Sequence, residues 1–588
     1  MTDTKQSRLT ATLLCVTPPD EHQEQGIRAF LQKKYGEDVA LTIQQDSSLK
    51  SGFQLHVGSE VYDWSAKGRM EQFRQQVEQL VAKNTRKDII PLLRSSIDEF
   101  RLLAKSSEVG TVKSIGDGIA VVEGLEHAAY GEILMFDNGI KGMVQDLRRN
   151  ETGCILFDNA DDISAGSKVA RTGKTAGVPV GDAFLGRVVD ALGRPIDGGD
   201  AIPADGYRPV EKPAPGIIDR QSVDTPMETG LLSIDAMFPI GRGQRELIIG
   251  DRQTGKTAIA LDAMLNQKGK NVICVYVAIG QKASSVAQLV ENLRKRDAMD
   301  YCVVVSATAG EADTMQYIAP YAGCAMAEYY MHKGRDVLIV YDDLSKHAIA
   351  YRAMSLLLER APGREAYPGD VFYLHSRLLE RSAHLSDKLG GGSMTALPIV
   401  ETQAGDVSAY IPTNIISITD GQIFLESDLF FAGQRPAVNV GLSVSRVGGA
   451  AQTKATKKAT GSLRLDLAQY REMEVFTQFS SDLDDSTKEQ LHYGQGLMRI
   501  LRQKQYHPLS MHQQVIVLVC AMGHVLSKVA VKDVTDFRDA LLDHFEQEHS
   551  DLCRSLEDEK VLTDDMKQEI LRIAEKYLAA NAERFRKE

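Results

Sequence analysis

The sequence lacks several features that would each direct its interpretation. Its seven cysteines are odd in number and include no CxxC pair, which predicts reduced thiols rather than a disulfide framework or a zinc site. No apolar run reaches the roughly 18 residues that span a bilayer, and residues 1–9 are too polar for a signal peptide. The formal net charge is -12 and no long Lys/Arg block occurs, so nucleic acid is not an expected partner. We therefore expect any membrane contact to come through partner proteins.

The beginning of the chain has the pattern of a small α/β module. Residues 9–16 resemble a strand, and residues 21–35 have helical composition. Alternating apolar residues at Phe53, Leu55 and Val57 predict a half-buried strand, followed by a hairpin turn at Gly58. Four more apolar residues then fall at helical spacing: Met70, Phe73, Val77 and Leu80.

The remaining sequence has three successive patterns of predicted secondary structure. Short alternating segments with frequent glycines predict a β-barrel, and apolar strands between helical segments then predict a parallel α/β sheet. The C-terminal part is mostly helical. We expect a multidomain α/β chain with a small module at residues 1–82, a linker and helix at 83–107, a β-barrel at 108–175, a P-loop domain at 176–455 and a helical domain at 456–588.

A phosphate-binding loop is the strongest motif. Residues 250–257 read GDRQTGKT and fit GxxxxGK[ST], between an apolar strand at 247–249 and an apolar helix at 258–265. Backbone N–H groups of such a loop, together with the helix N-terminus, favour a phosphate. Lys256 would reach the outer phosphates and Thr257 would bind Mg²⁺. A Gly-rich turn without a ligand is the alternative, which this strand–loop–helix context disfavours.

A strand ending in carboxylates supports the same interpretation. The apolar residues 337–341 are followed by Asp342 and Asp343. P-loop nucleotidases use a carboxylate in this position to hold Mg²⁺, directly or through water. Because strands often end in Asp at a turn, the prediction that Asp342 serves Mg²⁺ depends on the loop upstream.

Six short motifs specify the family more closely. They are GRGQRE at 241–246, YVAIGQK at 276–282, YDDLSK at 341–346, PGRE at 362–365, PTN at 412–414 and SVSRVG at 443–448. With these motifs the chain, from about residue 87 onward, resembles the alpha subunits of F-type ATP synthases. The resemblance implies a β-barrel crown, a RecA-like nucleotide domain and a C-terminal helical domain. It also implies a head of three alpha and three beta subunits around a gamma shaft, with a peripheral stalk of b and delta subunits.

The resemblance also implies which residues bind ATP or ADP with Mg²⁺. Thr257 and Asp342 would hold the metal. Glutamine amides can hydrogen-bond a purine edge, and an aromatic ring and a guanidinium can flank the base or ribose, although each such residue alone is more often ordinary packing. The residues that the resemblance implies for nucleotide binding are Gly250, Asp251, Arg252, Gln253, Thr254, Gly255, Lys256, Thr257, Ala258, Gln281, Phe430, Arg435, Gln503 and Gln505.

Three positions concern catalysis. An ATPase needs a carboxylate to polarise the attacking water, and related beta subunits carry Glu where this chain has Gln281. An amide cannot accept that proton, so we expect very slow hydrolysis, unless Gln281 is merely a polar loop residue. Arg446 matches the family arginine that reaches the neighbouring catalytic site, with a salt bridge inside the sheet as the alternative. Ser417 matches a family serine near the same interface.

The N-terminal segment resembles a different subunit. Residues 45–65, together with the following Gly68-Arg69-Met70, are similar to the C-terminal part of the ATP synthase delta subunit. Ser51 stands where glycine is usual, and Trp64 is inserted beside a normally small residue. An unrelated α/β cap is the alternative. A delta–alpha fusion implies a module that ties the head to the peripheral stalk.

The sequence therefore predicts a nucleotide-binding, non-catalytic alpha subunit of a rotary proton- or sodium-translocating ATP synthase. It would act in the complex on the cytoplasmic face of the bacterial membrane, with membrane contact only through that complex. The alternative is a self-sufficient RecA-like hexameric ATPase, such as a secretion ATPase or helicase. Gln281 argues against it, because a homohexamer needs its own water-activating carboxylate.

Overall fold

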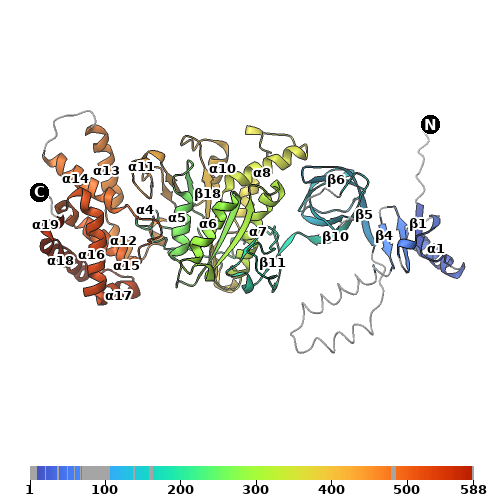
Figure 1. The fold of residues 1–588 in the computed structure, drawn as a ribbon, viewed down its shortest axis with the longest axis horizontal. Coiled ribbons are helices and arrows are strands. Elements are labelled where there is room, and N and C mark those ends of the chain that lie inside the picture. Colours follow the sequence, from blue (N-terminus) through green and yellow to red (C-terminus); the bar gives the residue numbers. More distant parts are fainter. Residues whose placement is uncertain are drawn as a thin grey trace, which may run out of the picture. The chain divides into compact units, whose positions relative to one another are not determined.

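The computed structural model (Figure 1) describes residues 10–19, 21–35, 39–49, 51–58, 60–65, 68, 106–136, 139–157, 163–477 and 485–585. The chain divides into two units, residues 1–176 and 177–588. The helix expected from Met70 to Leu80 and the linker and helix expected up to residue 105 lie outside the described residues.

The first part of unit 1 is a small four-stranded sheet with one helix. Its elements are β1 (Thr10–Cys15), α1 (Glu21–Tyr35), β2 (Ala40–Gln45), β3 (Phe53–Val57) and β4 (Glu60–Asp63). The strand order is β2-β1-β3-β4, with β1 parallel to β2 and antiparallel to β3. Side chains of alternate strand residues meet Leu31 of α1 in a core of Ala11, Leu13, Leu31, Leu55, Val57 and Tyr62. The predicted first strand, helix and hairpin are confirmed.

The rest of unit 1 is a closed antiparallel barrel. Its six strands are β5 (Ser106–Gly116), β6 (Ile119–Glu123), β7 (Glu132–Phe136), β8 (Lys141–Leu147), β9 (Glu151–Leu156) and β10 (Lys168–Thr175). The order β10-β7-β8-β9-β6-β5 closes because β10 also pairs with β5. Strand β5 is longer than its neighbours, and its first residues pair with β4, Tyr62 opposite Ser106. One strand therefore belongs to both the barrel and the small sheet.

Unit 2 is built on an eight-stranded sheet that carries the phosphate-binding loop. The strand order is β12-β16-β15-β17-β18-β14-β19-β20, parallel throughout except for β20. The strands are β12 (Val188–Val189), β14 (Leu247–Gly250), β15 (Val272–Gln281), β16 (Cys302–Thr308), β17 (Asp336–Asp342), β18 (Ser393–Glu401), β19 (Gly421–Leu425) and β20 (Val444–Ser445). A separate two-stranded ribbon, β11 (Gly177–Val180) with β13 (Gly206–Pro209), precedes most of it.

Helices surround the sheet and continue into a helical domain. The sheet helices are α4 (Leu232–Met237), α5 (Lys256–Leu265), α6 (Ala283–Arg294), α7 (Asp313–Met331), α8 (Leu344–Leu357), α9 (Val371–Leu379), α10 (Tyr410–Ile418) and α11 (Ser427–Phe431). The C-terminal helices are α12 (Lys454–Thr460), α13 (Leu463–Thr477), α14 (Asp485–Ile500), α15 (Met511–Met522), α16 (Val534–Glu548), α17 (Ser550–Glu559), α18 (Asp564–Ala580) and α19 (Ala582–Phe585).

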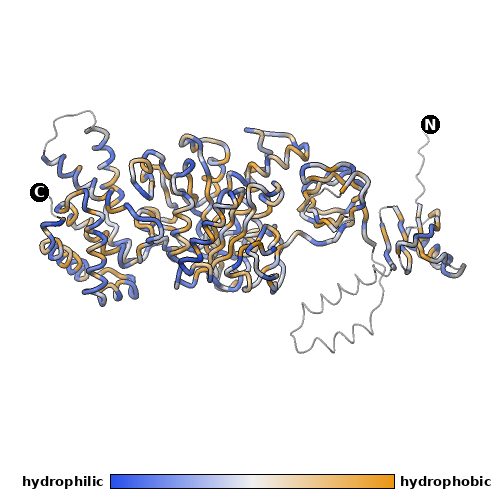
Figure 2. Tube along the Cα trace, in the orientation of Figure 1, coloured by the Kyte–Doolittle hydropathy of each residue, from blue (hydrophilic) through white to orange (hydrophobic). Residues whose placement is uncertain are grey.

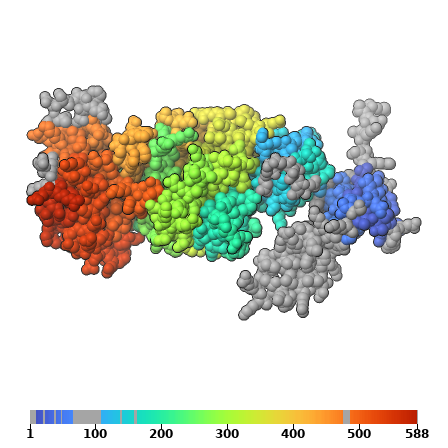
Figure 3. Space-filling view, viewed as in Figure 1, coloured from blue at the N-terminus to red at the C-terminus, as the bar shows by residue number. Residues whose placement is uncertain are grey.

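Apolar burial joins the sheet and the helical domain. Figure 2 shows apolar residues concentrated along the central strands, where β15 is buried from Val272 to Gly280. Such continuous burial is typical of a parallel sheet with helices on both faces. One core cluster runs from Ile259 and Met264 beside the sheet to Val515 and Leu518 of α15. Figure 3 accordingly shows the two domains of unit 2 as one continuous surface.

Two negative expectations can be checked against the structure. All seven cysteines are buried and free, as the lack of a cysteine pattern predicted. None of the helices in the described part of the chain combines the length and apolar character needed to cross a membrane. The multidomain α/β fold class with its barrel, P-loop sheet and helical domain is confirmed.

Candidate nucleotide-binding site

Three strands that lie close together in the sheet position the candidate site. β14 leads into the loop at residues 250–257, β17 ends in Asp342 and β15 ends in Gln281. β18 alone separates β14 from β17, and β15 lies directly beside β17. Because parallel strands place their carboxyl ends at one edge, the loop and both side chains meet there.

The loop has the backbone that a phosphate cradle requires. Gly255 is the N-cap of α5 and has a φ of 95°, in the left-handed region that favours glycine. A Cβ on Gly250 would lie 2.5 Å from the Leu425 carbonyl oxygen, so a side chain does not fit there. The first-turn N–H groups of α5 have no intrahelical acceptors and face the position of an anion.

Lys256 is folded over this loop. Its Nζ donates to the carbonyl oxygens of Gly250 at 2.8 Å and Asp251 at 2.5 Å. Burial lowers the pKa of Lys256, and the negative charges of Glu401 and Asp343 oppose that effect. The amine is thus held at the loop, where the oxygens of a bound phosphate would compete for its donors.

Asp342 is the centre of a buried hydrogen-bond network and is only 3% exposed. Its Oδ2 accepts from the Thr257 hydroxyl at 2.7 Å and from the Tyr276 hydroxyl at 2.6 Å. Its Oδ1 accepts from Gln281 Nε2 at 2.9 Å. Burial and the neighbouring Asp342 raise the pKa of Tyr276 well above its usual value, so this hydroxyl remains a donor. Three donors therefore fix the carboxylate beside the phosphate loop.

The other carboxylates at this edge are engaged elsewhere. Asp343 caps α8 by accepting from Lys346 N at 2.8 Å, and its side chain pairs with Lys346 Nζ at 3.3 Å. Burial raises the pKa of Asp343 to about 6, with Lys346 opposing the shift. Glu401, at the end of β18, pairs with Arg252, whose side chain is 83% exposed. Each of these two carboxylates therefore has a cationic partner.

A cavity of about 540 Å³ lies next to the loop and is lined by residues of α5, α11 and the helical domain. Arg435 places its guanidinium 4.3 Å from the centre of the Phe430 ring, a cation–π contact at the cavity wall. Ala258, Gln503 and Gln505 also line it. The volume suits a nucleoside, since ligand pockets measure roughly 300–1,000 Å³.

Two of the expected nucleotide residues have additional roles in the structure. The Gln503 amide ties the cavity wall to α4, accepting from Leu232 N at 3.1 Å and donating to Gly230 O at 2.6 Å. The Asp251 carboxylate accepts from Thr402 Oγ1 at 2.6 Å and Gly405 N at 2.8 Å. The Gln503 side chain therefore holds the cavity wall in place, and the Asp251 side chain holds the phosphate loop against residues 402–405.

Sequence reasoning did not assign a role to two polar residues of the site. Tyr276 lies in the motif YVAIGQK, but only the β15–β17 register shows that it meets Asp342. Asp262 lines the cavity and accepts from Tyr506 N at 2.8 Å, and burial raises its pKa to about 6. Asp262 follows Ala258 by four residues in α5, about one helical turn, so both lie on the same face of the helix, which is the signal that could have suggested it.

Arg446 and Ser417 lie away from this cavity on the surface. Arg446 follows β20, and its backbone N donates to Asp420 O at 2.8 Å. Its side chain is exposed and makes no ion pair with the residues that the structure describes. Ser417 is exposed on α10 and donates to Asn414 O at 2.7 Å. The alternative of an internal salt bridge for Arg446 is therefore not observed in the described ranges.

Comparison with protein families divides the chain into four matched segments. Residues 105–173 match the ATP synthase alpha/beta family β-barrel domain, 230–445 its nucleotide-binding domain and 452–577 its C-terminal domain. Residues 1–77 match the ATP synthase delta (OSCP) subunit.

Curated relatives match most of the chain. A protein from Clostridium botulinum named ATP synthase subunit alpha is 58% identical over 483 residues, which cover 82% of this chain and 96% of the relative. A protein of the same name from Clostridium kluyveri is 56% identical over 490 residues, covering 83% of this chain and 97% of the relative.

Proposed function

Because the chain belongs to the ATP synthase alpha/beta family, with an N-terminal delta-like segment, we propose that it is a non-catalytic, nucleotide-binding alpha subunit of a rotary F-type ATP synthase. It would bind ATP or ADP at the phosphate loop and in the adjacent cavity. It would alternate with catalytic beta subunits in the head of the complex, around a central gamma shaft. The complex would lie on the cytoplasmic face of the membrane and translocate protons or sodium ions.

The observation that carries the non-catalytic assignment is the contact between Gln281 and Asp342. The Gln281 amide donates to the carboxylate at 2.9 Å, in the place where hydrolysis requires a proton acceptor. An amide has no basic lone pair at neutral pH. The neighbouring carboxylates Asp343 and Glu401 are paired to the cations of Lys346 and Arg252.

The residues around Asp342 fit a magnesium ion. Thr257 Oγ1 and Asp342 Oδ2 are oxygen ligands 2.7 Å apart, and Mg²⁺ prefers oxygen ligands with several waters retained. When bound, Mg²⁺ would neutralise charge on the nucleotide phosphates. Thr257 and Asp342 would hold it, while Tyr276 and Gln281 orient the carboxylate.

Arg446 would act in the neighbouring beta subunit. Its exposed guanidinium has no ion-pair partner in the described part of this chain, so it is available to an adjacent active site. A guanidinium supplied in trans stabilises charge on the transferring phosphoryl group. Ser417 would lie near the same subunit boundary.

Turnover measurements test the assignment. The purified chain should bind MgATP in a nucleotide-binding assay and hydrolyse it negligibly, and activity should appear only after assembly with the beta subunit. A Lys256→Ala variant controls for binding at the loop, because it removes a charge-assisted phosphate contact. Robust hydrolysis by the isolated chain that is abolished by Lys256→Ala would refute the proposal and support a self-sufficient ATPase.

The N-terminal module would connect the head to the peripheral stalk. Support comes from the delta-subunit match at residues 1–77 and from the folded sheet of β1–β4. Covalent linkage raises the effective concentration of a stalk contact, so a modest affinity would suffice. The full-length chain should bind the cognate b subunit, and a chain lacking residues 1–105 should not. Equal binding by both would show that the module is not the stalk contact.

A further inference from the structure

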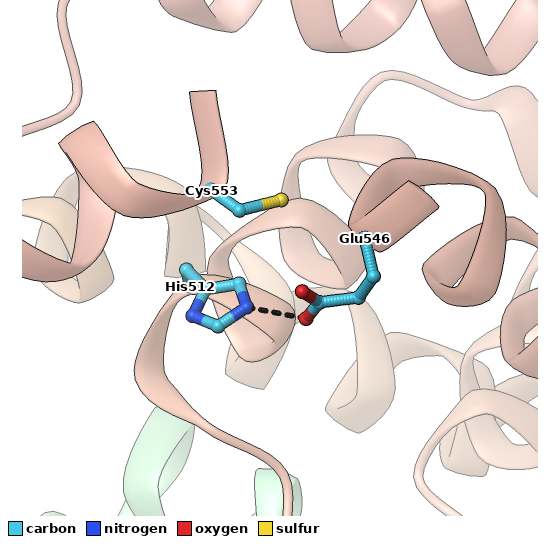
Figure 4. Close-up of side chains that lie close together, drawn as sticks. All are labelled: His512, Glu546 and Cys553. Atoms are coloured by element: carbon cyan, nitrogen blue, oxygen red, sulfur yellow. Dashed lines mark hydrogen bonds and ion pairs between the residues drawn. The ribbon is translucent and has the colours of Figure 1, made fainter. Parts of the chain in front are cut away.

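A cluster of metal-ligand side chains lies in the helical domain, away from the nucleotide site. Figure 4 shows His512, Glu546 and Cys553 converging from three different helices. His512 is in the first turn of α15, Glu546 near the end of α16, and Cys553 in α17. One ligand atom from each lies within 4.8 Å of the others.

The imidazole of His512 is held between two carboxylates. Nε2 lies 2.7 Å from Glu546 Oε1 on the side of the cluster, and Nδ1 lies 2.8 Å from Glu557 Oε2 on the opposite side. Glu557 also accepts from the backbone N of His512 at 3.1 Å, and the Ser510 hydroxyl lies 3.1 Å from Nδ1. Contacts that do not involve Glu546 or Cys553 therefore contribute to the ring orientation.

This arrangement has the two layers of a protein metal site. Metal-binding histidines usually donate their second ring N–H to a carboxylate, which fixes the tautomer and directs the other nitrogen at the metal. Glu557 occupies that outer position, while Nε2, the Glu546 carboxylate and the buried Cys553 sulfur face each other. A nitrogen, an oxygen and a sulfur ligand together select a borderline-soft cation such as Zn²⁺ over Mg²⁺ or Ca²⁺.

We propose that His512, Glu546 and Cys553 form a binding site for a divalent transition metal of the zinc class, with a water at the fourth position. The cysteine spacing in the sequence did not reveal it, because local CxxC patterns cannot detect ligands contributed by three helices. A bound ion would tie the start of α15 to the corner between α16 and α17.

The charge of a bound divalent ion is balanced by the protons that its ligands release. Without metal, both ligand groups favour their protonated forms: hydrogen bonds to Glu557 and Glu546 outweigh burial and raise the pKa of His512, and burial raises the pKa of Cys553 to about 11. Binding requires a neutral Nε2 and a thiolate, so one divalent ion replaces about two protons, which pass to the buffer. With Glu546 and Glu557 counted as carboxylates, the net charge of the cluster, in which Cys553 is buried and Glu546 is exposed, is then unchanged.

The test is titration of the full-length chain with zinc chloride by calorimetry in buffers of different ionisation enthalpy. The expected result is one ion per chain and release of about two protons per ion. Cobalt(II) should give a near-ultraviolet sulfur-to-metal charge-transfer band, because Cys553 would coordinate as a thiolate. A chain that binds no zinc, or that binds cobalt without this band, overturns the proposal.

Variants identify the ligands without depending on a single substitution. Cys553→Ser should abolish the cobalt band. Glu557→Gln, which leaves all three ligands in place, should weaken zinc about 10- to 100-fold. Glu559→Gln is the matched charge control on the same helix, and its exposed carboxylate contacts Ser555 rather than the cluster.

A second His/Glu group nearby, His544, Glu548 and His549, provides the competing location. His549→Gln should leave zinc binding unchanged. Loss of binding in His549→Gln with normal binding in Glu557→Gln would move the metal to that surface group and refute the assignment. The nucleotide site does not enter this experiment, so its outcome is independent of the proposed ATP synthase function.

Discussion

Replacing Tyr276 with phenylalanine isolates one hydrogen bond of the nucleotide site. The Tyr276 hydroxyl donates to Asp342 Oδ2 at 2.6 Å, and both residues are almost completely buried. The substitution keeps the ring and its packing but removes one of three donors to a carboxylate that is 3% exposed. Asp342 would then keep only Thr257 and Gln281 as side-chain donors.

The expected loss follows from the charge of the acceptor. A hydrogen bond to an ionised group contributes about 1.5–3 kcal/mol, more than a bond between neutral groups. For a domain of this size, about 1 kcal/mol shifts the melting temperature by roughly 2 °C. The P-loop domain of Tyr276→Phe should therefore melt about 3–6 °C lower. Added MgATP should recover part of the loss, because the metal would compensate the carboxylate charge.

Tyr341→Phe is the matched control. Tyr341 lies on the neighbouring strand β17 and is equally buried, but its hydroxyl has no nitrogen or oxygen partner in the described ranges and faces the Cys324 thiol. A thiol is a weak hydrogen-bond partner, so removing this hydroxyl should change stability much less than removing that of Tyr276. Differential scanning calorimetry of both variants, with and without MgATP, measures the difference. Melting temperatures that agree within about 1 °C would refute the role assigned to the Tyr276–Asp342 bond.

Three further perturbations follow from the site and its proposed role. Arg446→Ala should preserve assembly and nucleotide binding but reduce turnover of the reconstituted head by about 10³–10⁵, and near-normal turnover would contradict the role in trans. Lys256→Ala should weaken nucleotide binding to the isolated chain, measured by equilibrium dialysis; unchanged affinity would place the nucleotide elsewhere. Asp262→Asn tests a pKa. Burial raises the pKa of Asp262 to about 6, so this carboxyl destabilises the fold above pH 6 and the penalty fades as pH falls toward 4. The variant should be more stable at pH 7.5, by at most about 3 kcal/mol, and equal to the wild type near pH 4; a constant difference would exclude this cause.

The structural elements of the candidate site were predictable where they are local in the sequence. The strand–loop–helix around Lys256 is encoded in consecutive residues, and the apolar run before Asp342 predicts a strand whose end faces the loop. Gln281 was placed at a strand end, and β15 does end there. In each case the physical signal, an apolar strand followed by a polar turn, lies within about ten residues.

Contacts between distant segments could not be derived in the same way. Gln503 hydrogen-bonds Gly230 and Leu232, and no periodicity links a C-terminal turn to a helix so far upstream. The zinc-class cluster is another case, since three helices must pack before His512 meets Cys553. Strand β2 shows the same limit, because it pairs with β1 alone in the described residues and Ile43 is exposed although it is apolar.

Strand β5 has a mechanical consequence because it belongs to two sheets. Its first residues pair with β4 through antiparallel backbone hydrogen bonds, and its remaining residues form part of the closed barrel wall. A force directed along the strands loads all the β4–β5 hydrogen bonds together in shear. A force across the strands breaks these hydrogen bonds one after another. The same join is therefore stiff in one direction and weak in the perpendicular one. Single-molecule pulling from the two corresponding attachment geometries would give a high and a low rupture force for one and the same contact.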